Sequence, residues 1–130
     1  MNFTSKHAIK ITLFILTSVV LFHCCIILKI IPYEIAWGGR LKSDTEMYVF
    51  ETLSIFINLF LLWVLLMKGA FVKSRLSHKA IQIILWVFII LFALNTIGNL
   101  FAKAIIEKVF SILTLGLSIL LWHIVRNKKE

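Results

Sequence analysis

The 130-residue sequence contains few of the features that a soluble enzyme or a nucleotide-binding protein needs. It has one proline, two cysteines and six acidic residues. It has no Walker loop, no Gly-x-Ser-x-Gly elbow, no His-Glu-x-x-His pair and no dinucleotide-binding fingerprint. Its cysteines, Cys24 and Cys25, are adjacent and lack the spacing of a zinc site. These absences argue against an energised pump and a soluble-type hydrolase, and we predict no metal and no cofactor.

Apolar residues, by contrast, are abundant and gathered into long runs. The chain is 61% hydrophobic, compared with about 45–50% in soluble domains. Four runs predict helices over about residues 9–31, 47–67, 80–102 and 107–125. Each approaches or exceeds the roughly 17–25 residues that a helix needs to cross the hydrocarbon of a bilayer. We therefore expect an all-α integral membrane protein, with residues 1–130 forming one domain of four transmembrane helices.

The first apolar run has an alternative interpretation as a signal peptide, because Lys6 and Lys10 precede it. However, it extends to Ile31, which is longer than the roughly 7–15 apolar residues of a signal peptide, and no small-x-small cleavage site follows. We expect it to be retained as a helix.

The basic residues predict the orientation of the chain. Cytoplasmic segments retain an excess of Lys and Arg, and an inside N-terminus places nine of the fourteen on the inner side: Lys6, Lys10, Lys68, Lys73, Arg75, Lys79, Arg126, Lys128 and Lys129. We therefore expect both termini to be cytoplasmic, in an up-down-up-down antiparallel bundle. In the inner loop, Lys68, Lys73, Arg75 and Lys79 are expected to bind anionic lipid headgroups. The net charge of +8 thus indicates a membrane surface, and no motif for nucleic acid accompanies it.

The connection between the first two helices is expected to be a short interfacial loop on the outer side. Pro32 is expected to close the first helix because it lacks the N–H that a helix interior needs. The segment 43–46 has the spacing of a capping box and is expected to start the second helix. Glu34, Trp37 and Arg40 are candidate ligand contacts, since an arginine can hold a carboxylate or phosphate with two hydrogen bonds. The alternative is an interfacial turn held by Trp37 alone.

Polar residues recur at helical spacing in three of the four predicted helices, so that each helix presents one polar or small face. These faces comprise Glu51, Ser54 and Asn58; Asn95, Gly98, Asn99 and Ala102; and Ser111, Thr114 and Ser118. We expect the faces to converge in the outer half of the bundle around a polar pocket. The predicted ligand contacts are Glu51, Asn58, Asn95 and Asn99, together with Glu34, Trp37 and Arg40.

Each polar face also has a purely structural interpretation. Small and hydroxyl residues at this spacing let membrane helices pack closely, and amides can hydrogen-bond between helices. Glu51 lies near headgroup depth, where it can be a solvated interfacial carboxylate. His23 is the only histidine within a predicted span, and we expect it to hydrogen-bond a neighbouring helix.

The run from Val49 to Asn58 resembles the second span of four-helix emopamil-binding or sigma-2-type proteins, which place a carboxylate there in a sterol-sized cavity. The resemblance covers about ten residues, and no further motif matches. An intramembrane isomerase-type enzyme is therefore one alternative, and it would use Glu51 and His23 as acid and base. The resemblance itself assigns no residue a role.

The sequence thus favours a module that binds a small amphipathic or lipid-like ligand, without predicting catalysis. The main alternative is an accessory, assembly or immunity-type protein that contacts a membrane-protein partner through its helices. A small transporter or channel subunit, acting as a homodimer, is a further alternative. It has less support, because the spans contain no proline to break a helix.

Overall fold

The computed structural model describes residues 4–35, 41–102 and 105–126, and these are all-helical apart from short connections. The four long helices are α1 (Ser5–Ile27), α2 (Asp44–Lys68), α3 (His78–Leu100) and α4 (Ile105–Arg126), and a short 3₁₀ helix, η1 (Tyr33–Ile35), follows α1. Each long helix is long and apolar enough to cross a membrane, which suggests a multi-pass membrane protein. The prediction of four such helices is confirmed.

Helix α1 lies about four residues nearer the N-terminus than predicted. It begins at Ser5 because the Thr4 side chain accepts a hydrogen bond from the His7 backbone N–H at 3.2 Å. It ends at Ile27 because Lys29 adopts a left-handed conformation, with φ of 63°. The N–H of Lys29 donates to Ile26 and that of Ile30 to Cys25, which is a Schellman motif. The prediction that Pro32 ends the helix is therefore wrong.

Helix α2, like α1, begins at a side-chain cap and ends at a residue in the left-handed conformation. The Ser43 hydroxyl accepts from the Glu46 N–H at 3.2 Å, as predicted, and Glu46 accepts from the Lys42 N–H at 2.9 Å. At the other end Ala70 is left-handed, with φ of 60°. Its N–H donates to Met67 in a second Schellman motif. Both non-glycine residues in these turns carry a backbone cost that glycine would avoid.

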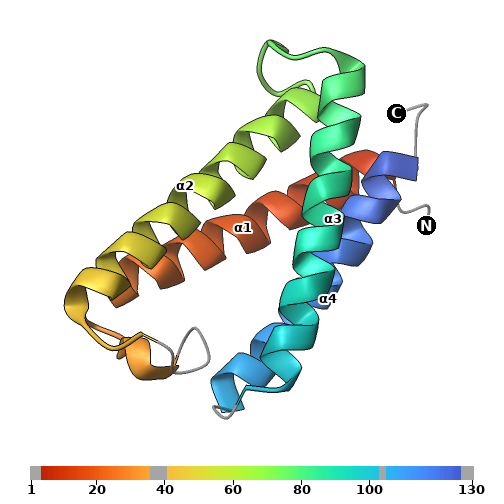
Figure 1. Ribbon diagram of the computed structural model, residues 1–130. Coiled ribbons are helices and arrows are strands. Elements are labelled where there is room, and N and C mark those ends of the chain that lie inside the picture. Colours follow the sequence, from red (N-terminus) through yellow and green to blue (C-terminus); the bar gives the residue numbers. More distant parts are fainter. Residues whose placement is uncertain (1–3, 36–40, 103–104, 127–130) are drawn as a thin grey trace.

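The helices are arranged as two hairpins that meet at one end of the molecule (Figure 1). Helix α1 packs along α2, and α3 packs along α4. Helix α1 also contacts α4, whereas α2 touches α3 over a small area only. The hairpins cross near the start of α1, the end of α4 and the loop between α2 and α3, and they separate toward their other two turns (Figure 1).

Charge divides the molecule into two ends. The end where the hairpins meet, here called the basic end, carries Lys6, Lys10, Lys68, Lys73, Arg75, Lys79 and Arg126. The opposite end, here called the acidic end, carries the acidic residues that the structure describes: Glu34, Asp44, Glu46, Glu51 and Glu107. It also carries three described lysines, Lys29, Lys42 and Lys108.

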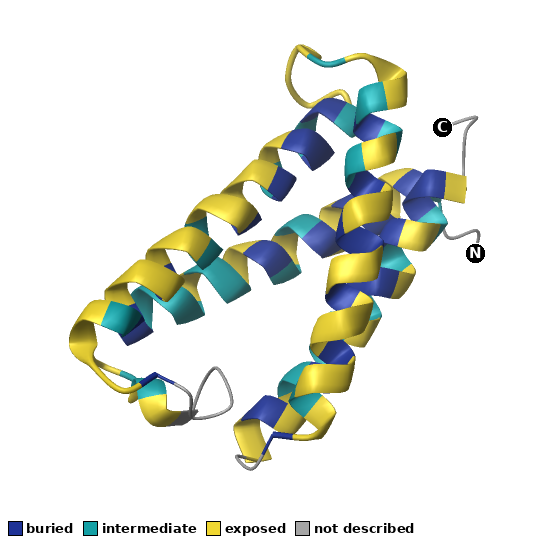
Figure 2. Cartoon of the chain, viewed as in Figure 1, coloured by how far each residue is buried: buried dark blue, intermediate teal, exposed yellow. Residues whose placement is uncertain are grey.

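The main apolar core lies toward the basic end and draws on all four long helices. Its fully buried members include Leu16, Leu65, Leu85 and Leu121. A second, smaller cluster of Ile26, Leu41 and Met47 joins α1 to the start of α2 at the acidic end. Buried residues face the neighbouring helices, and exposed apolar residues cover the outside of every helix (Figure 2). An outer surface of this kind suits contact with lipid.

Candidate functional site

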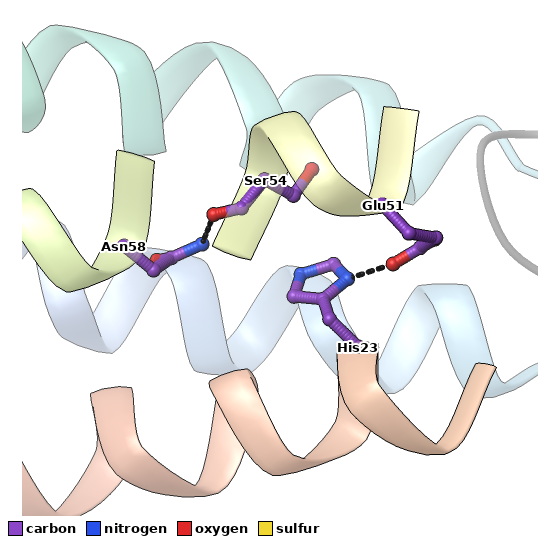
Figure 3. A network of polar contacts seen from close by, with 4 residues as sticks. All are labelled: His23, Glu51, Ser54 and Asn58. Atoms are coloured by element: carbon purple, nitrogen blue, oxygen red, sulfur yellow. Dashed lines mark hydrogen bonds and ion pairs between the residues drawn. The ribbon is translucent and has the colours of Figure 1, made fainter. Parts of the chain in front are cut away.

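The most unusual polar feature of the fold is a fully buried carboxylate paired with a histidine. Glu51, two turns into α2, has no solvent exposure, and its Oε2 atom contacts Nδ1 of His23 on α1 (Figure 3). The His23 side chain is 16% exposed. The structure therefore places Glu51 inside the helix pair, and His23 hydrogen-bonds a neighbouring helix as predicted.

This pair matters because an isolated carboxylate is expensive to bury in apolar surroundings. An imidazole can compensate it through a hydrogen bond between a ring nitrogen and the carboxyl group. This hydrogen bond also joins α1 to α2. The second ring nitrogen of His23 points away from Glu51, toward the side of α2 that carries Asn58 (Figure 3).

Asn58 lies on α2 close to this pair and is buried, but its amide is partly used within its own helix. Its Nδ2 atom donates to the backbone oxygen of Ser54 at 2.8 Å (Figure 3). Ser54 is half-buried. Glu51, Ser54 and Asn58 thus lie along α2 as their spacing predicted, and Glu51 and Asn58 are both buried.

The predicted polar face of α3 is oriented differently. Asn95 is exposed and Asn99 is half-buried. The buried polar residue of this turn is Thr96, whose hydroxyl lies 2.8 Å from that of Thr114 on α4. One turn further along α4, Ser118 donates to the backbone oxygen of Ile89 at 3.0 Å. The expected convergence of all polar faces is therefore wrong: α1 and α2 share one polar cluster, and α3 and α4 share another.

The connection between α1 and α2 is described only in part. Trp37 and Arg40 lie outside the described residues, and Glu34 is exposed in η1. Lys29 pairs with Asp44 at 2.6 Å, and both side chains are about half exposed. The hydrogen bond that Lys29 donates to Asp44 is the main cause that raises the pKa of Lys29 above its ordinary value, and the negative charge of Asp44 is the second. This pair fastens the end of α1 to the start of α2.

A groove that sequence reasoning missed lies between α1 and α4. Its volume is about 240 Å³, and its lining is formed by Phe14, Ile15, Ser18, Val19, Phe22, Phe110 and Leu113. The rings of Phe22 and Phe110 meet edge to face, with centroids 4.7 Å apart, and so join the two hairpins beside the groove. Ser18 donates its hydroxyl to the backbone oxygen of Phe14 at 3.0 Å. The groove is therefore apolar throughout its lining.

The groove and the buried pair are neighbours. Phe22 lines the groove, and its ring lies 5.9 Å from the ring of His23. No sequence signal indicated the groove, because its residues, apart from Ser18, are ordinary apolar residues of two helices that are far apart in the chain. Among the described residues, no group of three His, Cys, Asp or Glu side chains is placed to hold a metal ion. Comparison with protein-family models, curated proteins and solved structures finds no match to this chain.

Proposed function

We propose that the chain crosses the bilayer four times and binds the hydrocarbon chain of an amphipathic, lipid-like molecule between α1 and α4. The observation that carries this proposal is the apolar groove of about 240 Å³. Small-molecule sites are concave, mostly apolar and commonly found between helices. The groove has this character, and it lies beside the buried polar pair formed by His23 and Glu51.

The size of the groove favours a narrow, flexible ligand. An apolar cavity of about 150 Å³ holds benzene, which has six carbons. On that scale the groove, at about 240 Å³, has room for roughly ten carbons. Three phenylalanine rings and branched aliphatic side chains form most of the lining. An alkyl or acyl chain fits these dimensions and this chemistry.

The polar end of such a molecule would lie near His23. The ring of Phe22 lines the groove and meets the imidazole of His23 edge to face, with centroids 5.9 Å apart. The second nitrogen of this imidazole points away from Glu51 (Figure 3). In the neutral ring, one nitrogen donates a hydrogen bond and the other accepts one. A hydroxyl or carboxyl group of the ligand would therefore find a partner at this nitrogen.

The proposed topology is up-down-up-down, with both termini cytoplasmic. The basic end gathers seven described Lys and Arg residues, and the described acidic residues lie at the opposite end. Excess positive charge favours the cytoplasmic side. Lys68, Lys73, Arg75 and Lys79 would then contact anionic headgroups, at roughly 1 kcal/mol for each residue near the surface.

A groove-filling substitution tests the binding proposal. Leu113→Trp places a large side chain in the groove lining, whereas Ile112→Trp makes the same change at a neighbouring position that is 73% exposed. Lauric acid is added to the full chain in a cholate-type detergent, whose rigid rings do not imitate an alkyl chain. Binding is measured by native mass spectrometry.

The wild-type chain and Ile112→Trp should retain lauric acid equally, and Leu113→Trp should bind it about tenfold more weakly. That loss corresponds to two displaced methylenes at about 0.8 kcal/mol each. Equal binding by all three proteins would contradict the proposed site.

A further inference from the structure

The groove between α1 and α4 lies in the part of the molecule nearer the acidic end. Helix α1 ends and α4 begins at that end (Figure 1). On α1 the lining extends from Phe14, near the middle of the helix, to Phe22, five residues before its end. On α4 it is formed by Phe110 and Leu113, both in the first half of the helix. The lining therefore does not reach the basic end.

The main apolar core bounds the groove on the side of the basic end. Ile15 of the lining packs against this core. One turn beyond Leu113 on α4, Leu117 belongs to the core and is only 1% exposed. The open side of the groove is at the outer surface of the helices, where Phe14 is 75% exposed and Ser18 is also exposed. An alkyl chain can therefore enter sideways from surrounding lipid.

The length of the groove matches one leaflet of a bilayer. Phe22 follows Phe14 by eight positions, so the lining extends about 12 Å along α1 at about 1.5 Å per residue. The hydrocarbon of one leaflet is about 15 Å thick, half of the roughly 30 Å of a bilayer. If the helices span the bilayer as proposed above, the groove lies mostly within the leaflet at the acidic end. A lipid with its head at the opposite surface would reach it only with its methyl end.

We propose that the groove takes its ligand sideways from the leaflet at the acidic end, with the polar head at that surface and the methyl end near the middle of the bilayer. This inference rests on the binding function proposed above and adds the source and direction of the ligand. The direction agrees with the polar groups, since Phe22 at the outer end of the groove adjoins His23, whereas the other end borders the apolar core. With the proposed topology, this is the non-cytoplasmic leaflet.

The experiment supplies a photoactivatable lipid to one leaflet only. The full chain, with a C-terminal affinity tag, is reconstituted into liposomes in both orientations. A protease added outside removes the tag from chains whose basic end faces outward, because α4 ends there. The protease is then inactivated, and lysophosphatidylcholine with a diazirine in its acyl chain is added outside. Light follows at once, because a charged headgroup crosses hydrocarbon slowly.

Chains that keep the tag have their acidic end on the side of the added lipid. In these chains the label on the groove lining should exceed the label on Leu21 and Ile112, which are exposed residues at similar depth and report contact with bulk lipid. In chains that have lost the tag, this excess should be absent. An equal excess in the two populations, or a larger one in the chains without the tag, would overturn the inference and leave the binding proposal standing.

Failure of the binding proposal gives a different result. Leu113→Trp should remove the excess, whereas Ile112→Trp, the matched control, should label like the wild-type chain with Leu21 as the reference. If neither population shows an excess on the groove lining, or if Leu113→Trp leaves it unchanged, the groove is not the binding site. The binding proposal is then contradicted, and the inference about the leaflet with it.

Discussion

The two ends of the molecule differ in what holds them together. At the basic end, buried leucines from all four helices form the main core, and the charged residues remain on the surface. Toward the acidic end the hairpins separate, and polar side chains enter the helix contacts: His23 with Glu51, and Thr96 with Thr114. Polar contacts also occur at the basic end, where the Gln82 amide donates to the backbone oxygen of Val125 at 3.3 Å. The difference is that apolar packing dominates the basic end, whereas side chains of neighbouring helices bond each other at the acidic end.

The largest expected effect comes from breaking the buried pair at the acidic end. His23→Leu leaves Glu51 buried without its imidazole and should lower the free energy of unfolding by about 3–5 kcal/mol. Replacing both residues with leucine should recover much of this loss, because no charge then needs compensation. Unfolding in mixed micelles with increasing SDS measures both variants. A double variant as unstable as His23→Leu would contradict this account of the pair.

The next effect concerns the core at the basic end. Leu65 is fully buried, whereas Leu94 is 61% exposed on α3. Leu65→Ala should cost about 2–4 kcal/mol of unfolding free energy, because it leaves a cavity. Leu94→Ala, the matched control, should cost far less in detergent. Similar losses in both variants would show that the apolar interior at this end is not the main source of stability.

A smaller effect should distinguish the two Schellman turns. Ala70 is exposed and carries the cost of a left-handed conformation, so Ala70→Gly should stabilise the protein by about 1 kcal/mol. Lys29→Gly relieves the same strain but removes the ion pair with Asp44. Its gain in the free energy of unfolding should therefore be smaller than that of Ala70→Gly. Thermal unfolding of both variants provides the comparison, and a larger gain for Lys29→Gly would contradict it.

The smallest effect is expected for the hydroxyl contact between α3 and α4. Thr96→Val keeps the shape of the side chain but removes the hydrogen bond to Thr114, and should cost about 0.6 kcal/mol, the average for polar contacts between membrane helices. Thr17→Val is a suitable control, because Thr17 bonds only to its own helix and is exposed. Equal losses in the two variants would show that the contact between helices adds nothing.

The sequence predicts the four helices well because long apolar runs have few alternatives in lipid. It fails at the end of α1, where the helix stops through a left-handed Lys29, a residue type that rarely signals such a turn. It predicts that Glu51 and Asn58 share a face. It brings His23 together with Glu51 only in the enzyme alternative, because their contact depends on the register of two packed helices.

The face of α3 shows the same limit more clearly. Helical spacing groups Asn95 with Asn99, but it cannot tell which side of the helix meets a neighbour. Successive residues of a helix point in directions about 100° apart. Thr96 therefore lies in the interface with α4, whereas Asn95, one residue earlier, lies outside it. Charge and hydropathy thus predict the elements, whereas the pairing of hairpins determines which polar residues meet.

The α1–α4 groove can be tested most directly by photolabelling. A fatty acid with a diazirine near its methyl end is equilibrated with the full chain in liposomes, activated by light, and the labelled residues are identified by peptide mass spectrometry. Our account predicts that the label concentrates on the α1 segment 14–22 and the α4 segment 110–113. A label spread evenly over the exposed faces of all four helices, with no excess at these two segments, would contradict it.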